Sequence, residues 1–205
     1  MKTTVIGITG GSGSGKTTMI RNLIKRFGDD IAVIYQDSYY HRHDDLPFSE
    51  RKRLNYDHPD AFDMQLFYSH ILALKDGRSI CQPVYDFAAH NRSNETVLVE
   101  PKHIIVIDGL LLLHDKRIRD LIDIKIFVDA EPDVRLVRRI QRDVKFRGRS
   151  IDSVTTQYIN TVKPMHDLFI EPSKQYADLV VLHGGKNPAA MSLLYSLCNE
   201  VLGKN

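Results

Sequence analysis

The sequence predicts an α/β fold, in which a doubly wound parallel sheet is flanked by helices and carries a small antiparallel β-hairpin insertion. Three observations lead to this prediction. Short apolar runs alternate with stretches of helical periodicity along the 205 residues. A glycine-rich segment joins the first apolar run to the first helical stretch. Near the middle of the chain, two apolar runs are separated only by a polar connection, as in a hairpin.

Five apolar runs are short and continuous, which is typical of parallel strands buried on both faces of a sheet. They occupy Val5–Thr9, Ile31–Tyr35, Ile104–Asp108, Ile124–Val128 and Leu179–Leu182. Between the first two runs, Thr17–Phe27 has a helical pattern that stops before Gly28. Its apolar face consists of Met19, Ile20, Leu23, Ile24 and Phe27. The other predicted helices are Ala61–Lys75, Asp133–Lys145, Ser153–Val162 and Pro188–Leu202.

One region breaks this alternation. Ile80–Phe87 and Glu95–Glu100 have the pattern of two strands, with the polar stretch His90–Asn94 between them. We expect a hairpin insertion over about residues 79–101, at the edge of the sheet. A substrate pocket can be built at such an insertion.

The composition is that of an ordinary globular protein and argues against several classes of partner. Apolar residues make up 42% of the chain, and 28 Lys and Arg stand against 26 Asp and Glu. This balance gives no sign of nucleic-acid binding, and no apolar run approaches the roughly 18 residues of a membrane span. Two cysteines, Cys81 and Cys198, argue against a disulfide framework. We therefore expect one cytoplasmic domain over residues 1–205, without nucleic-acid or membrane partners.

The glycine-rich segment Gly10–Thr17 reads GGSGSGKT and fits the pattern G-x-x-x-x-G-K-[ST] without a mismatch. Its backbone N–H groups can point at phosphate oxygens, Lys16 can reach the β and γ phosphates, and the Thr17 hydroxyl can hold Mg²⁺. A flexible linker would need neither Lys-Thr at this offset nor a strand before it and a helix after it. We therefore predict a P-loop NTPase-type sheet. The predicted ATP-binding residues are Gly10, Gly11, Ser12, Gly13, Ser14, Gly15, Lys16, Thr17 and Thr18.

Two carboxylates stand at the ends of predicted strands. Asp37 follows the second apolar run closely, and Asp108 ends the third. In open α/β sheets ligands bind beyond the carboxyl ends of the strands, so both acids are expected to face the phosphate site. One would accept the proton of a substrate hydroxyl, and Asp108 would hold Mg²⁺. Helix caps or turns are the alternative roles for both residues.

A series of arginines follows the fourth predicted strand. Arg135, Arg138, Arg139 and Arg142 recur at helical spacing, within an arc of about 100°. Arg147 and Arg149 follow around a glycine, in a predicted lid over about residues 144–152. Guanidinium groups suit phosphate oxygens, so we interpret Arg147 and Arg149 as catalytic clamps. A solvated surface face is the alternative, and one or two of the helix arginines are expected to form structural ion pairs.

With these features assembled, the chain resembles the uridine kinase (uridine–cytidine kinase) family nearly end to end. The resemblance is carried by GITGGSGSGKTT, QDSYY, NYDHPDAFD, PVYDFAAHNR, IFVDAEPDVRLVRRIQRDVKFRGRS, QYINTVKPMHDLFIEPSKQYAD and GGKN. It implies a phosphotransferase that moves the γ-phosphate of ATP or GTP to the 5′-hydroxyl of uridine or cytidine in pyrimidine salvage. It also implies Mg²⁺ as cofactor and a homotetramer.

The same resemblance implies roles for individual residues. Asp37 is implied as the general base, and Asp57 as the partner of the ribose hydroxyls, helped by Arg139 and Gln157. Arg149 is implied near the base and the phosphates. Around the pyrimidine, the implied residues are Tyr85 and His90 at its polar edge and Tyr40, Tyr56 and Phe87 along the ring.

Three alternatives remain open from the sequence. Another small-molecule kinase, such as a nicotinamide riboside kinase or a phosphoribulokinase, would share the P-loop. A cationic nicotinamide would favour an acidic or purely aromatic pocket, whereas Tyr85 and His90 suit a neutral pyrimidine. A nucleotide-dependent switch of the GTPase kind would call for an N-K-x-D motif, and a transport ATPase for L-S-G-G; the sequence contains neither.

Overall fold

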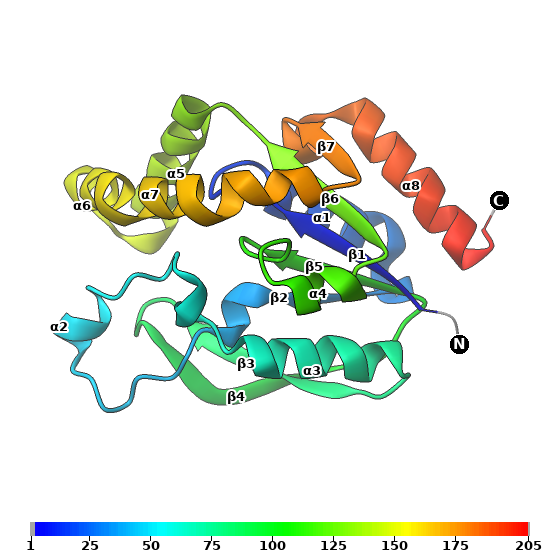
Figure 1. Ribbon diagram of the computed structural model, residues 1–205, viewed down its shortest axis with the longest axis horizontal. Helices are drawn as coiled ribbons and strands as arrows, with labels where there is room; N and C mark the ends of the chain where they lie inside the picture. The colour runs from blue at the N-terminus through cyan, green and yellow to red at the C-terminus, as the bar shows by residue number, and fades with distance from the viewer. Residues whose placement is uncertain (1–2, 205) are drawn as a thin grey trace.

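The computed structural model describes residues 3–204, and its centre is a five-stranded parallel sheet (Figure 1). The strand order is β2-β5-β1-β6-β7, and every neighbouring pair runs parallel. The strands are β1 (Thr4–Thr9), β2 (Ile31–Tyr35), β5 (Ile104–Gly109), β6 (Ile124–Asp129) and β7 (Leu179–Leu182). The five predicted strands are confirmed to within one residue at each end.

Helices cover both faces of this sheet (Figure 1). One face packs against α1 (Lys16–Phe27) and α8 (Pro188–Leu202), and the other against α3 (Met64–Lys75) and α4 (Lys116–Leu121). The sequence predicted the first three of these helices, with α3 starting later than expected. The reason is Asp63, whose side chain accepts a hydrogen bond from the backbone N–H of Leu66 and caps the helix there.

The core has two parts because successive strand residues point to opposite faces of the sheet. In β1, Ile6 and Ile8 pack towards α1 and α8, whereas Val5 packs towards α3 and α4. All three are fully buried. Of the predicted apolar face of α1, Ile24 is half exposed, while the other four members are buried. The buried sheet holds the carboxyl ends of its central strands in fixed register.

A long helical region runs along one end of the molecule. After α5 (Pro132–Arg147) and Gly148, it comprises α6 (Ile151–Gln157), two π-helical segments (Tyr158–Val162 and His166–Ile170) around α7 (Lys163–Met165), and a 3₁₀ helix (Glu171–Tyr176). The sequence predicted a helix only as far as Val162. Pro164 and Pro172 each lie in the first turn of a new segment, where a missing N–H is tolerated, so helical structure continues past both.

The hairpin insertion is present, but its second strand begins earlier than predicted. β3 (Ile80–Asp86) pairs antiparallel with β4 (Asn91–Val99), so the polar stretch predicted as the connection is largely strand. These polar residues do not face a core; Arg92, for example, donates to the backbone carbonyls of Tyr39 and Tyr40. The hairpin stands beside the edge strand β2, where Gln82 accepts a hydrogen bond from the backbone N–H of Tyr35.

Shorter elements complete the described chain. They are α2 (Phe48–Arg51) and the 3₁₀ turns Gly28–Asp30, Gln36–Tyr39, Pro59–Ala61 and Gly184–Lys186. Across residues 3–204, no helix combines the length and the apolar character that a membrane crossing requires.

Candidate active site

The carboxyl ends of β1, β2 and β5 open into one cleft of ≈ 1540 Å³, which the hairpin and the α5–α6 region enclose. The cleft brings together all the residues predicted to be catalytic, to bind the nucleoside or to hold metal. They are Lys16, Thr17, Asp37, Tyr40, Tyr56, Asp57, Tyr85, Phe87, His90, Asp108, Arg139, Arg147, Arg149 and Gln157. Of the predicted ATP-binding residues, Gly10, Gly11 and Ser14 lie beneath the lining, and the other six line it.

The glycine-rich loop turns tightly between β1 and α1. Gly13 has φ +83°, and a Cβ atom there would lie 2.4 Å from the carbonyl oxygen of Arg135, so no other residue fits. Lys16 Nζ donates to the carbonyl oxygens of Gly10 at 2.7 Å and Gly11 at 3.2 Å. Burial lowers the pKa of Lys16, and the carboxylates of Asp108 and Asp37 partly offset this effect. The loop thus has the form of an anion-binding site, with the Lys16 ammonium group held against its own carbonyl oxygens.

Two carboxyl groups face this cradle from neighbouring strands. Asp108 lies in β5, and Asp37 lies in the 3₁₀ turn after β2. Gln36 is fully buried and accepts a hydrogen bond from the backbone N–H of Leu111 at 3.0 Å, which ties the two strand ends together. Burial raises the pKa of Asp37, although Lys16 opposes the rise. A carboxylate with a raised pKa beside a phosphate site is well suited to accept a hydroxyl proton.

The residues present fit a magnesium ion. Burial raises the pKa of Asp108 to about 6, and its Oδ1 atom is buried without a hydrogen-bond partner in residues 3–204. An unpartnered carboxylate oxygen in the cleft that Thr17 also lines is suited to a hard cation. No group of three or more His, Cys, Asp or Glu side chains in the described chain can hold a metal by itself. A cation here would therefore share its coordination with phosphate oxygens and water, as Mg²⁺ commonly does.

An aromatic pocket fills the hairpin side of the cleft. The ring centroids of Tyr40 and Tyr85 are 4.9 Å apart, and those of Tyr85 and Phe87 are 5.2 Å apart. Tyr56 donates its hydroxyl to the carbonyl oxygen of His90, which has an unusual φ of 49°. The Tyr85 hydroxyl is buried beside the Tyr56 hydroxyl, and no well-formed hydrogen bond satisfies it within the described residues. A buried hydroxyl with spare hydrogen-bonding capacity in an aromatic wall is suited to a ligand that is both flat and polar.

Between this pocket and the phosphate loop lie the predicted ribose-binding residues Asp57, Arg139 and Gln157. Arg139 donates from Nη1 to Ser12 Oγ at 3.0 Å and from Nη2 to Gln157 Oε1 at 2.9 Å. Asp57, only 6% exposed, lies nearby, and burial raises its pKa against the opposing charge of Arg139. The contact with Ser12 links the predicted ribose-binding residues directly to the P-loop.

The arginines after β6 have separate tasks. Arg135 is buried and donates to the carbonyl oxygen of Ala130, so its role is structural. The expected ion pairs are those of Arg139 and Arg142 with Asp143. Arg138 donates to the loop carbonyls of Gly13 and Ser14 at 3.3 Å. The guanidinium of Arg147 lies 4.7 Å from the ring centre of Phe87, across the cleft. The predicted lid is thus in contact with the hairpin in this structure.

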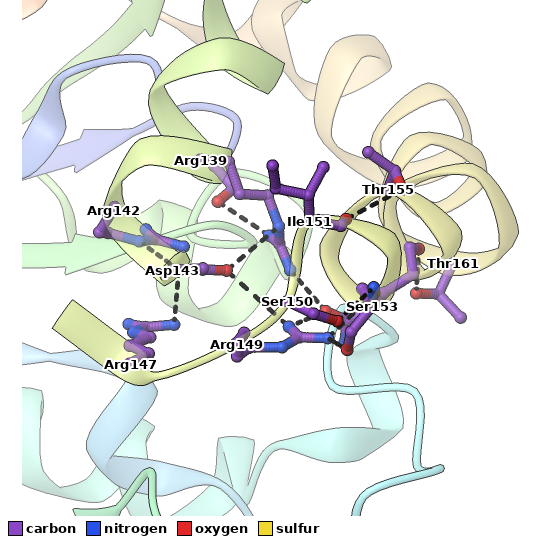
Figure 2. A network of polar contacts seen from close by, with 12 residues as sticks. Arg139, Arg142, Asp143, Arg147, Arg149, Ser150, Ile151, Ser153, Thr155 and Thr161 are labelled. Carbon is purple, nitrogen blue, oxygen red and sulfur yellow. Dashed lines mark hydrogen bonds and ion pairs between the residues drawn. The ribbon is translucent and has the colours of Figure 1, made fainter. Parts of the chain in front are cut away.

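Three residues that position this site were not predicted. Gln36 joins the two strand ends that carry Asp37 and Asp108, and Arg92 holds the turn that carries Asp37 by its donation to the carbonyls of Tyr39 and Tyr40. Asp143 is the buried counter-ion of the arginine series (Figure 2). Its spacing of four residues from Arg139 is a signal, visible in the sequence, of an ion pair along a helix.

Comparison with known proteins gives matches over nearly the whole chain. Residues 5–190 match the model of the Phosphoribulokinase / Uridine kinase family. A uridine kinase of Clostridium perfringens is 50% identical over 200 residues, 97% of this chain and 96% of that protein. One of Bacillus subtilis is 50% identical over 202 residues, 98% of this chain and 96% of that protein. The phosphoribulokinase of Rhodobacter spheroides shares the fold, with a TM-score of 0.62 at 16% identity over 86% of this chain and 68% of that one.

Proposed function

This chain belongs to the Phosphoribulokinase / Uridine kinase family, and on that premise we propose that it transfers the γ-phosphate of ATP to the 5′-hydroxyl of uridine and cytidine. One observation carries the proposal. A polar-edged aromatic pocket, with the buried hydroxyl of Tyr85, opens into the same cleft as Asp37 and the P-loop. A pyrimidine nucleoside offers a flat base to that pocket and a 5′-hydroxyl to the carboxylate.

The chemistry follows from the arrangement of charge. Asp37 accepts the proton of the 5′-hydroxyl as its oxygen attacks the γ-phosphorus, in line with the leaving oxygen of ADP. Lys16 moves from the loop carbonyls to the phosphate oxygens, and Arg147 and Arg149 neutralise charge on the transferred group. Thr17 and Asp108 would hold Mg²⁺, which when bound would screen charge on the phosphates. The closed cleft keeps water from replacing the nucleoside as acceptor.

The pocket favours a neutral pyrimidine over other acceptors. Burial lowers the pKa of His90, and the nearby guanidinium of Arg149 lowers it further, so the imidazole is neutral at pH 7. A neutral imidazole and the Tyr85 hydroxyl can both donate to and accept from the edge of uracil or cytosine. The ring of nicotinamide riboside carries a positive charge, and these two neutral groups supply no opposite charge to it.

Replacement of His90 by Ala should raise KM for uridine and cytidine by different amounts. O4 of uracil accepts a hydrogen bond where N4 of cytosine donates one, so the loss of one polar partner affects the two bases unequally. The larger effect should be about 1–3 kcal/mol, the cost of an unmatched buried polar group. Steady-state kinetics with both nucleosides measure it. Small and equal changes would mean that His90 only supports the turn of the hairpin.

The activity should fall on the acid side at a pH above the ordinary aspartate range. Because burial raises the pKa of Asp37 above 3.8, the carboxyl takes up its proton at a higher pH than an exposed aspartate. Protonated Asp37 cannot act as a base, so kcat/KM for uridine should decrease as the pH is lowered through this pKa. A profile between about pH 4.5 and pH 8 measures the decrease. The same acid-side decrease in the residual activity of Asp37→Asn would contradict the assignment, because it would then belong to another group such as Asp108.

A panel of acceptors tests the proposed function. ADP release is followed with uridine, cytidine, nicotinamide riboside and ribulose 5-phosphate, and the products are identified by mass. Turnover with the two pyrimidine nucleosides, giving UMP and CMP, supports the proposal. Faster turnover with either of the other acceptors would replace it with one of the alternative kinases. ADP release that no acceptor stimulates would favour a nucleotide switch.

We further propose that the enzyme works as a homotetramer in the cytoplasm, in the salvage of pyrimidine nucleosides. This proposal is supported by the family resemblance of the sequence. Light scattering on the purified protein measures its oligomeric state; a monomer at all concentrations would contradict the tetramer.

A further inference from the structure

A single carboxylate lies at the centre of the arginine cluster. Asp143 is fully buried in α5, and its side chain faces four guanidinium groups (Figure 2). Arg142 Nε lies 2.7 Å and Arg147 Nη1 3.6 Å from Oδ1, while Arg139 Nε lies 3.7 Å and Arg149 Nη1 3.8 Å from Oδ2. Four guanidinium groups therefore surround one carboxylate at the wall of the cleft, and the charges of Asp57 and Asp37 act on Arg139 and Arg147 from further away.

Most of these contacts are loose. Only Arg142 makes a hydrogen bond with the carboxylate, and Oδ2 of Asp143 is buried with no hydrogen-bond partner among residues 3–204. A buried ion pair that served stability alone would be expected to satisfy both oxygens, because an unsatisfied buried charge is costly. At 3.6–3.8 Å, Arg139, Arg147 and Arg149 are attracted to Asp143 without a hydrogen bond to it. The terminal nitrogens of Arg139 donate to Ser12 and Gln157, and those of Arg149 to Gln157 and Ser153, whereas the Arg147 guanidinium makes no hydrogen bond within residues 3–204.

The cluster connects the parts of the cleft that must act together. Arg139 contacts Ser12 of the phosphate loop, and Arg149 donates to Gln157 at 2.5 Å. Arg147 reaches across to the aromatic wall of the hairpin. Asp143 lies four residues after Arg139 and four residues before Arg147 in α5. This spacing places its carboxylate between an arginine that contacts the phosphate loop and an arginine of the lid.

We propose that Asp143 is a positioning residue that holds the guanidinium groups of Arg147 and Arg149 in the cleft until the phosphoryl group takes its place as their anionic partner. Arg142 stays on Asp143 and anchors it. The excess positive charge makes the exchange favourable, because a polyphosphate brings the negative charge that the cluster lacks. The inference rests on the proposed function only in identifying that anion with ATP.

The test measures anion binding and turnover separately in Asp143→Asn. Inorganic tripolyphosphate should bind the variant about tenfold more tightly, because no carboxylate competes for the guanidinium groups. With uridine and ATP, kcat should fall about 10-fold to 100-fold, because the arginines are no longer aligned. Asp143→Glu restores the charge and should return tripolyphosphate affinity to that of the unmodified protein. Asp133→Asn makes the same charge change at an exposed position of α5, where the carboxylate accepts a hydrogen bond from the backbone N–H of Val134, and should leave both properties unchanged.

A merely structural carboxylate predicts a different pattern. Asp143→Asn would then lower both tripolyphosphate affinity and kcat, in step with a lower unfolding temperature, and that result overturns the proposal. If the variant does not fold, NMR of the arginine Nε–H groups in the unmodified protein decides. Added tripolyphosphate should shift Arg147 and Arg149 and leave Arg142 in place; unchanged Arg147 and Arg149 signals overturn the proposal.

The readouts keep the two proposals apart. Tripolyphosphate binding does not depend on the identity of the acceptor. Tighter binding by Asp143→Asn in a protein that ignores uridine upholds the role of Asp143 and removes the uridine kinase assignment. Rapid uridine turnover by the unmodified protein, with unchanged or weaker tripolyphosphate binding by Asp143→Asn, upholds the uridine kinase assignment and removes the proposed role of Asp143.

Discussion

Asp37→Asn is expected to lower kcat for uridine by about 10²–10⁴-fold while ATP affinity stays close to that of the unmodified enzyme. The amide keeps the shape of the carboxyl group but cannot accept the proton of the 5′-hydroxyl. Asp37 is held in place by the turn that Gln36 and Arg92 fix, so the substitution should disturb the local structure little. Single-turnover and steady-state rates, with ATP binding measured separately, give the two quantities.

Two comparisons make this experiment specific. Asp45→Asn, at an exposed position in the following loop, should have no effect on either rate. Lys16→Ala should damage the use of ATP with every acceptor, because Lys16 serves the phosphate donor. Near-normal turnover by Asp37→Asn would remove this residue from the mechanism.

Loss of either lid arginine should lower kcat about 10²–10³-fold, the scale for removing one preorganised donor from a transition state. ATP affinity should fall much less, because the P-loop and Lys16 hold the nucleotide before the lid acts. Arg149→Ala should also weaken nucleoside binding, since Arg149 shares Gln157 with Arg139. Arg26→Ala, at an exposed arginine in the last turn of α1, is the matched control.

Closure of the predicted lid over residues 144–152 should be visible by proteolysis. Gly148 follows Arg147 with φ +61°, and a Cβ atom added there would meet nothing within 4 Å, so the junction has the backbone freedom of glycine and open space on that side. Protease cleavage near residues 144–152 should slow when uridine and a non-hydrolysable ATP analogue are added together. Protection by the analogue alone, or none at all, would show that this segment is a fixed turn.

The sheet and the phosphate loop were predictable from the sequence because their signals are local. The strands are continuous apolar runs, and the loop has one glycine at each tight turn. The start of the second hairpin strand was predicted at Glu95 instead of Asn91, because Asn91 and Arg92 are polar and resemble a loop. Their polar partners lie in other parts of the chain. Arg92 bonds to Tyr39 and Tyr40, and this contact exists only after folding.

The site residues also divide into those with a local signal in the sequence and those without one. Strand position alone indicated Asp37 and Asp108, whereas the assignment of Tyr85 and His90 to a base came from family resemblance. Asp143 was missed because its spacing shows a neighbour relation but not burial. Its complete enclosure by arginines depends on how α5 meets α6 and the lid, which periodicity within one helix does not determine.

The most direct measurement compares uridine with 5′-deoxyuridine, which lacks only the hydroxyl that is proposed to react. With uridine and ATP, ADP should form rapidly and in equal amount with UMP. With 5′-deoxyuridine, ADP formation should stay at the rate seen with ATP alone, while the analogue inhibits uridine phosphorylation competitively. Rapid ADP formation with 5′-deoxyuridine, or the same rate with and without uridine, would contradict transfer to the 5′-hydroxyl in this cleft.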